Sequence, residues 1–203
     1  MQKSEFLFCY NIKAMNTFMH NTLRFHIEKI LPLTDEEAEL ILSFFILKKY
    51  KKHQFLIQQG EPVKYNYFIV KGLLKLVLSE ETAKSHIVGF AMEDWWETDF
   101  QAYYNRTDAT MSLECIEDTE VLCLSLENYK KLCKVLPKME HFFLEKAYSG
   151  YIAAQQRVIS TMISDTKERY RQLLEKYPSL IQRVPKSLLA SYLGVSRETL
   201  SRL

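Results

Sequence analysis

The sequence lacks a hydrophobic run long enough to span a membrane or to direct secretion. Its longest apolar candidate, "LILSFFIL" at residues 40–47, falls well short of the roughly 18 to 20 residues that a transmembrane helix needs. The N-terminal segment has a short apolar patch but no signal-like hydrophobic region with a small-residue cleavage site. We therefore expect a cytoplasmic protein with no membrane partner.

The sequence also lacks the spacings of catalytic and metal-binding motifs. Its four cysteines show no Cys-x-x-Cys spacing, and its five histidines are dispersed without a His-Glu-x-x-His pattern. No Gly-x-Ser-x-Gly pattern occurs either. The cysteines, which we expect to be buried thiols, are Cys9, Cys115, Cys123 and Cys133. The sequence therefore indicates no metal, no cofactor and no enzyme activity.

A basic segment closes a chain whose net charge is only +2. Residues 166–203 carry eight lysines and arginines against three glutamates, a net charge of +5, which leaves −3 for the rest of the chain. A basic piece on a slightly acidic body is typical of a module that binds a polyanion. On charge alone, a solvated helical surface rich in lysine and arginine is an alternative.

Residues 34–125 have the pattern of an antiparallel β domain. Short β-branched, aromatic and leucine-rich runs stand between Gly60, Pro62 and Gly72. The segments "SHIVGF", "ATMSLECI" and "TEVLCLS" follow at the strand-plus-turn spacing of a sandwich or barrel. At the start, Thr34 and Glu37 form a capping-box pattern that predicts a preceding helix.

A long helix is predicted over residues 138–164, where no proline occurs. Two apolar rows run along it at spacings of three and four. Because one β domain cannot cover both rows, we expect one face to meet the same helix of a second subunit in a two-fold homodimer. The candidate dimerisation residues are Phe143, Ala147, Tyr151, Ala154, Val158 and Met162. A central core helix in a monomer is the alternative.

Two short helices joined by a tight turn are predicted near the C-terminus. Pro185 suits the first turn of a helix, Gly194 suits the left-handed position after its end, and Ser196 suits the N-cap of the next helix. This is the pattern of a helix-turn-helix, whose second helix enters the DNA major groove. Arginine there can donate two hydrogen bonds to guanine, and glutamate can accept from cytosine.

The start of that second helix places Arg197, Glu198, Ser201 and Arg202 on one outward face. We therefore expect this face to contact base edges. A surface ion pair between Glu198 and Arg202, worth under about 1 kcal/mol, is the alternative on these residues alone.

Two segments resemble the signatures of one protein family. "FLIQQGEPVKYNYFIVKG" resembles the β-roll signature, and "LGVSRETLSR" resembles the recognition helix, of Crp/Fnr superfamily transcription regulators. The resemblance implies an α+β fold. It consists of an antiparallel, cyclic-nucleotide-binding-like β-roll of jelly-roll type with N-terminal helices over residues 1–136, a dimerisation helix over 137–164 and a helix-turn-helix over 165–203. Family members usually continue beyond this helix, so we expect the C-terminal end of the module to be missing from this sequence.

The resemblance also implies residue roles and partners. Arg197, Glu198 and Arg202 would read bases, Thr199 or Ser201 would reach phosphate, and Lys186 would lie on the preceding helix that crosses the DNA backbone. The implied partners are double-stranded DNA, a second copy of the chain, RNA polymerase and a small-molecule effector of unknown identity. The alternative is a ligand-sensing or protein-interaction module with a vestigial helix-turn-helix, which has no reason to keep the C-terminal charge excess.

The resemblance fails where cyclic-nucleotide-binding members hold the cyclic phosphate. Those members carry a Gly-Glu pair and an Arg-Ser/Thr-Ala segment, whereas here Thr110 fits the Ser/Thr place and Ala109 replaces the arginine. Residues 93–108 carry five carboxylates against one arginine, which would repel a phosphate. We therefore expect an effector other than cyclic AMP. The candidate ligand-pocket residues are Glu97, Asp99, Ala109 and Thr110.

Two further features of the sequence bear on the effector. Cys9 stands alone near the N-terminus, which argues against the iron–sulfur branch of the family. The aromatic residues between Trp95 and Tyr104 are suited to line a pocket for a neutral aromatic or apolar molecule. Packing of the β-roll is the alternative role for this aromatic cluster.

Overall fold

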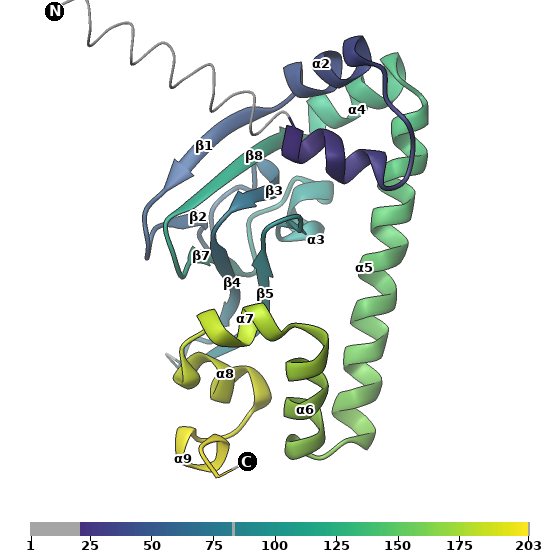
Figure 1. Cartoon of the computed structure of the whole chain (residues 1–203). Coiled ribbons are helices and arrows are strands. Elements are labelled where there is room, and N and C mark those ends of the chain that lie inside the picture. Colours follow the sequence, from purple (N-terminus) through teal and green to yellow (C-terminus); the bar gives the residue numbers. More distant parts are fainter. Residues whose placement is uncertain (1–20, 83, 203) are drawn as a thin grey trace, which may run out of the picture.

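The computed structural model describes residues 21–82 and 84–202 of the chain. A β-roll forms the upper part of the molecule, a long helix runs down one side, and a small helical module lies below the roll (Figure 1). Cys9 lies outside the described residues. Within the described part, no helix is long and apolar enough to cross a membrane.

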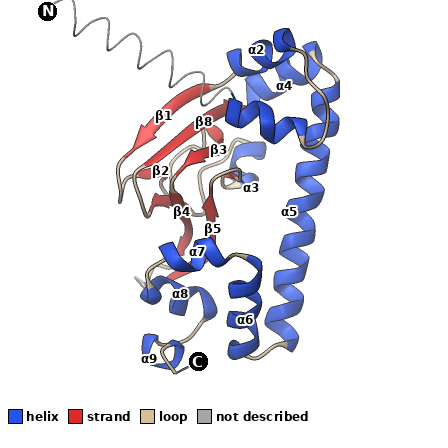
Figure 2. Cartoon of the chain, viewed as in Figure 1, coloured by secondary structure: helices blue, strands red, loops and turns tan. Residues whose placement is uncertain are grey.

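The β-roll consists of two four-stranded antiparallel sheets (Figure 2). The strand orders are β1-β8-β3-β6 and β2-β7-β4-β5. The strands are β1 (Ile46–Tyr50), β2 (Phe55–Ile57), β3 (Tyr65–Lys71), β4 (Leu73–Ser79), β5 (Ser85–Met92), β6 (Trp96–Glu97), β7 (Ser112–Cys115) and β8 (Thr119–Ser125). This architecture confirms the predicted antiparallel β domain.

Gly72 is the single residue at which the chain passes from one sheet to the other, between β3 and β4. Its φ of 117° favours glycine, and an added Cβ would lie 2.8 Å from the Thr119 Cα atom. The interior between the sheets is filled by a buried apolar cluster that includes Tyr67 and Ala109. The Tyr67 hydroxyl donates to the Leu56 carbonyl oxygen at 2.9 Å.

Helices cap the roll at its upper end. Residues 21–28 are helical, and α2 (Asp35–Ser43) and α4 (Leu126–Val135) lie beside them. The predicted capping box of α2 is present, because Thr34 and Glu37 exchange two side-chain-to-backbone hydrogen bonds of 3.2 and 2.9 Å. Lys138 donates to Glu37 and to the Pro32 carbonyl oxygen, which fixes the start of the long helix on this cap.

The long helix α5 (Lys138–Ile163) confirms the helix predicted from the absence of proline. Met139 and Phe142 at its start are buried in the cap. From Ala147 onward the helix leaves the cap and runs past the roll with nearly all its side chains exposed. Burial of the apolar side chains in its second half would therefore require contacts that the roll does not provide.

The C-terminal module contains α6 (Thr166–Lys176), α7 (Pro178–Arg183), α8 (Lys186–Leu193) and α9 (Arg197–Leu200). Asp165 caps α6 by accepting from the Glu168 N–H at 2.8 Å. The short helix α7 was not predicted. Pro178 ends α6 and also occupies the first turn of α7, a position that tolerates the missing N–H.

Candidate functional site

A helix-turn-helix is formed by α8 and α9. Gly194 follows α8 with a φ of 73°, and its N–H donates back toward the carbonyl oxygens of Ala190 and Ser191. The Ser196 hydroxyl then accepts from the Thr199 N–H at 3.1 Å and caps α9. The glycine turn and the serine cap that the sequence predicts are thus both present.

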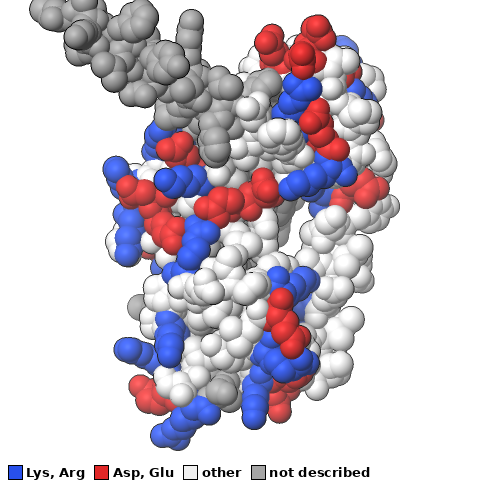
Figure 3. All heavy atoms as spheres, viewed as in Figure 1, with Lys and Arg blue, Asp and Glu red and all other residues white. Residues whose placement is uncertain are grey.

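The residues predicted to contact DNA are exposed on this motif. They are Arg197, Glu198, Thr199, Ser201 and Arg202 on or directly after α9, and Lys186 at the start of α8. Lysine and arginine side chains gather at this lower end of the molecule (Figure 3). The structure therefore brings the candidate DNA-contacting residues into one small module.

These residues differ in how far their polar groups are already engaged. The Thr199 hydroxyl lies 3.1 Å from the Ser196 hydroxyl, and the Ser201 hydroxyl donates to the Arg197 carbonyl oxygen at 3.0 Å. In the described part of the module, the ion pairs join α6 residues to one another and Arg183 to the roll, and none includes Glu198 or Arg202. The predicted alternative of an ion pair between these two is absent.

The module docks on the roll through an apolar interface. Leu73, Ile87 and Phe90 of the roll share one buried cluster with Leu180, Leu189 and Leu193 of the module. The rings of Phe90 and Tyr192 lie 5.2 Å apart, and the Arg157 guanidinium of α5 lies 4.4 Å from the Tyr192 ring centre. The roll and α5 together therefore orient the helix-turn-helix.

Arg183 adds a polar clamp to this interface. Its guanidinium donates to both carboxylate oxygens of Glu93, at 2.7 and 3.0 Å, and to both of Glu117, at 3.1 and 2.7 Å. Glu93 also accepts from the Gly72 N–H at 2.8 Å. Burial opposes ionisation of Glu93, but these donors hold the pKa of its carboxyl below the usual range. Sequence reasoning missed this clamp because its members have no characteristic spacing.

The second half of α5 carries an uncovered apolar stripe. Among the predicted dimerisation residues, Phe143 packs against the core of its own subunit, and Ala147 and Ala154 line a cavity. Tyr151, which lines the same cavity, is 61% exposed, and Val158 and Met162 are 59% and 79% exposed. The stripe also contains Leu144, Tyr148, Ile152, Ile159 and Ile163. The lower part of α5 is almost free of charged atoms in Figure 3.

Asp99 closes the segment where the resemblance places a cyclic phosphate. Its buried carboxylate accepts from the N–H groups of Ala102, Thr110 and Met111 at 3.1, 2.7 and 3.2 Å, and from the Thr110 hydroxyl at 2.7 Å. Burial would raise the pKa of Asp99, but these four hydrogen bonds together lower it. Ala109 is buried beside them. Three of the predicted pocket residues thus satisfy one another or are enclosed.

A separate cavity of about 940 Å³ lies between the roll, α3 (Phe100–Asn105), α4 and α5. The fourth predicted pocket residue, Glu97, lines it, whereas Asp99, Ala109 and Thr110 do not. The aromatic residues in its wall include Trp95, Trp96, Phe100, Tyr103, Tyr129 and Phe143. The aromatic segment singled out in the sequence therefore both packs against the core and lines a cavity.

Two hydrogen-bond acceptors lie in this aromatic wall. The Glu97 carboxylate accepts from the N–H of the adjacent Thr98 at 3.0 Å, and burial raises the pKa of Glu97 to about 7. The Asn66 Oδ1 atom is buried and has no hydrogen-bond partner among the described residues. Sequence reasoning missed Asn66, although a lone amide inside the strand "YNYFIV" is a detectable signal.

In the part of the chain described, no three His, Cys, Asp or Glu side chains form a metal-ligand group.

Comparisons with known proteins agree with this architecture. The family model described as "Cyclic nucleotide-binding domain" matches residues 47–135, from β1 to the end of α4. The "cAMP-activated global transcriptional regulator CRP" of Salmonella typhimurium is 22% identical over 182 residues, which cover 85% of this chain and 87% of that protein.

Two solved structures show the same fold. FixK2 from Bradyrhizobium japonicum matches with a TM-score of 0.68 and 16% identity, over 78% of this chain and 81% of that one. The c-di-GMP responsive global regulator CLP of Xanthomonas campestris matches with a TM-score of 0.66 and 16% identity, over 83% and 89%. The relatives are regulators rather than enzymes, in agreement with the sequence prediction. The chain therefore carries a cyclic nucleotide-binding domain over residues 47–135 and shares the fold of these regulators, as its resemblance to the Crp/Fnr superfamily implies.

Proposed function

We propose that this protein is a homodimeric, sequence-specific DNA-binding transcription regulator whose α9 helices enter the major groove. The observation that carries the proposal is the exposed set of Arg197, Glu198 and Arg202 on a helix-turn-helix whose turn and cap have the required geometry. Arginine and glutamate at the start of such a helix match guanine and cytosine edges. RNA polymerase as a further partner rests on the family resemblance alone.

The individual residues would divide between base and backbone contacts. Arg197, Glu198 and Arg202 would read bases, because no ion pair within the described module competes for their charges. Thr199 and Ser201 would reach phosphate only by giving up their present hydroxyl hydrogen bonds. Lys186, exposed at the start of α8, would contact the DNA backbone.

The exposed stripe of α5 supports the homodimer. Leu144, Tyr148, Tyr151, Gln155, Val158 and Met162 follow one another at alternating spacings of four and three. This is the heptad spacing of a coiled-coil seam, and only Gln155 in it is polar. The Gln155 amide donates to the Tyr151 hydroxyl at 3.0 Å within the helix. A second copy of α5 would bury this seam in a two-fold pair and set the two α9 helices at half-site spacing.

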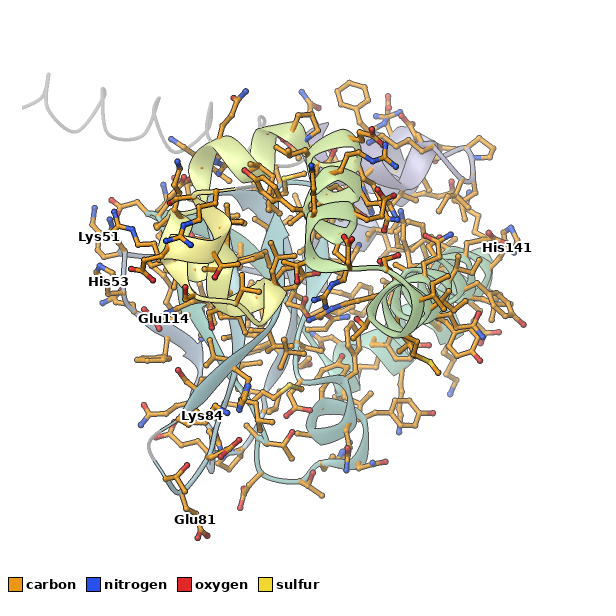
Figure 4. The ribbon with its side chains drawn as sticks, turned by 90° about the horizontal axis from the view of Figure 1, so that it is seen from below. Lys51, His53, Glu81, Lys84, Glu114 and His141 are labelled. Atoms are coloured by element: carbon orange, nitrogen blue, oxygen red, sulfur yellow. The ribbon has the colours of Figure 1, made fainter. Side chains whose placement is uncertain are left out.

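The DNA proposal is tested on a binding site selected from random duplexes, with a scrambled duplex beside it, across a salt series. Arg197→Ala should cost about 1 to 3 kcal/mol on the selected site and relax preference at one base pair. Lys186→Ala should weaken both duplexes alike and reduce the salt slope by about one. Lys84→Ala is the matched control, because Lys84 lies on the β4–β5 hairpin away from the module (Figure 4).

Equal losses of affinity on both duplexes for Arg197→Ala would leave α9 as a charged surface only, which is the vestigial alternative.

The dimer is tested by sedimentation. Val158→Glu should dissociate it, because a buried carboxylate in the seam lacks a partner, while Lys130→Glu on exposed α4 surface should leave it intact. A monomeric wild type, or an unaltered dimer of Val158→Glu, would contradict the proposed seam.

A further inference from the structure

Arg169 of α6 contacts the turn of the helix-turn-helix from inside the C-terminal module. Its Nη2 atom donates to the Leu193 carbonyl oxygen and to the Thr166 hydroxyl, both at 3.2 Å. We propose that Arg169 is a positioning residue for base recognition, which holds the turn before α9 so that the arginine and glutamate of α9 meet base edges. This inference rests on the proposed function, because it concerns how α9 reaches DNA.

The Leu193 carbonyl oxygen is the last one of α8 and needs a donor from outside that helix. The N–H groups of Gly194 and Val195 donate further back in α8, to residues 190–191, at 2.9 to 3.1 Å. Among the described residues, the donor to Leu193 is Arg169. A cation at the C-terminal end of a helix also interacts favourably with the helix dipole. Arg169 therefore supplies both the hydrogen bond and the charge that suit the end of α8.

Stability of the module alone does not explain an arginine at this position. Arg171 and Arg183 pair with glutamates, whereas no ion pair within the described module includes Arg169. The Arg169 side chain is partly buried, and its Nε atom is buried without a hydrogen-bond partner among the described residues. Because an unpaired buried donor costs free energy, an apolar side chain would fill the same space at lower cost. The contact with the turn is what distinguishes the guanidinium from such a side chain.

The helix that carries Arg169 is itself tied to the lower end of α5. The Ser160 hydroxyl of α5 donates to Gln172 Oε1 at 2.8 Å, and the Lys176 ammonium donates to Gln156 Oε1 at 3.1 Å. The exposed seam of α5 is the face proposed to pair two subunits. A hydrogen-bonded connection therefore runs from the dimer helix through α6 and Arg169 to the turn before α9. Loss of Arg169 should change the direction of α9 relative to the dimer.

The direction of α9 matters because base recognition requires aligned groups. Arg197, which begins α9, follows Gly194 by only three residues. Its guanidinium would donate two hydrogen bonds to one guanine, and a tilt of the helix would separate these donors from their acceptors. Phosphate contacts depend on charge over a longer range and tolerate such a tilt. Loss of Arg169 should therefore reduce the preference for the selected duplex more than the affinity for DNA in general.

The test compares Arg169→Met with Arg171→Met on the selected and the scrambled duplex. Both substitutions remove one positive charge from α6, so they weaken non-specific attraction to DNA alike. Arg171 is a matched control, because it is exposed and pairs with two glutamates of its own helix. We expect Arg169→Met to lose about tenfold in affinity for the selected duplex relative to the scrambled one. Arg171→Met should keep the wild-type ratio of the two affinities.

Two further measurements separate positioning from a loss of folding. Arg169→Lys keeps a positive charge and N–H donors at the end of α8, so it should recover part of the preference that Arg169→Met loses. Hydrogen exchange of peptides from residues 190–200 should be faster in Arg169→Met, while peptides from α7 and the β-roll should exchange as in wild type. A general loss of folding would instead raise exchange throughout the protein and lower the affinity for both duplexes alike.

Three results would overturn the proposal. They are an Arg169→Met variant that keeps the wild-type preference, an Arg169→Lys variant that discriminates no better than Arg169→Met, and unchanged hydrogen exchange at the turn. A wild type that prefers no duplex would instead refute the proposed function, and the role of Arg169 in base recognition with it. Hydrogen exchange would then still decide whether Arg169 holds the turn.

Discussion

The stretch from Glu93 to Asp99 places similar carboxylates in very different surroundings. Asp99 is buried and accepts four hydrogen bonds, and its pKa is lowered. Glu97, only two residues before it, accepts one, and burial raises its pKa to about 7. At Asp99 the four hydrogen bonds outweigh the effect of burial on the pKa, whereas at Glu97 the single hydrogen bond does not.

Glu93 shows a third solution in the same stretch. Burial opposes its ionisation, yet the Arg183 guanidinium and the Gly72 N–H lower its pKa. Arg183 remains partly exposed, so water screens this clamp and its contribution to stability is modest. The acidic stretch thus supplies one carboxylate for docking the module, one for the cavity wall and one for closing a loop. The net charge of the stretch does not distinguish these roles.

Among changes to these carboxylates, removal of Asp99 should lower the stability of the protein most. Asp99→Ala leaves the Ala102, Thr110 and Met111 N–H groups unpaired and removes the cap of α3, so the free energy of unfolding should fall by about 4 kcal/mol. Urea unfolding at neutral pH measures this loss. Asp99→Asn, which keeps one acceptor, should be intermediate. A loss below about 1 kcal/mol for Asp99→Ala would show that the loop finds other acceptors.

Glu97 should show a smaller effect of opposite sign. Its folded pKa of about 7 exceeds the ordinary value of 4.5, so between these values the folded state binds more protons than the unfolded state. Stability should therefore fall as pH rises from about 4.5 to 7. In Glu97→Gln this fall is absent, and the variant should be more stable than wild type at pH 8 by roughly 2 kcal/mol.

Urea midpoints at pH 5 and pH 8 test this expectation, with Glu81→Gln on the exposed hairpin as the control. For Asp99 we expect the opposite dependence of stability on pH. Because its folded pKa lies below the ordinary 3.8, its contribution is present above that value and is lost as pH falls through the folded pKa. Equal pH slopes for wild type and Glu97→Gln would contradict the environment assigned to Glu97.

Local chemistry explains which features the sequence could predict. The Gly194 turn, the Ser196 cap and the capping box at Thr34 each depend on residues within a few positions of one another, and all three are present. The Asp99 network and the Arg183 clamp depend on partners that only folding brings close. The helix α7 shows a third limit, because one proline can both end a helix and begin another.

The long helix shows the same limit for a surface. Its apolar spacing predicts a second contact face, in a row that includes Phe143, Ala147 and Ala154. In the structure Phe143 packs against the core of its own subunit, whereas Ala147 and Ala154 are exposed and border the cavity. The direction of a stripe depends on how α5 leaves the cap, which Lys138 fixes through α2. The heptad seam that we propose therefore depends on knowing which side of α5 is buried.

The last prediction is that cyclic AMP does not bind to the wild-type protein. A cyclic phosphate at the loop would need the Thr110 and Met111 donors, which the Asp99 carboxylate already holds at 2.7 to 3.2 Å. Ala109, at the place of the phosphate-binding arginine, is 5% exposed and offers no guanidinium.

The Asp99 loop and the aromatic cavity would each oppose the nucleotide for a different reason. In the loop, the ligand would have to displace a carboxylate whose ionised form is stabilised. In the cavity it would meet the Asp94 and Glu97 carboxylates against the single cation Lys146. Calorimetry should therefore detect no binding of cyclic AMP at tens of micromolar, about −6 kcal/mol on the affinity scale. Micromolar binding by wild type would contradict the closed loop, and its loss in Thr110→Ala would locate the nucleotide there.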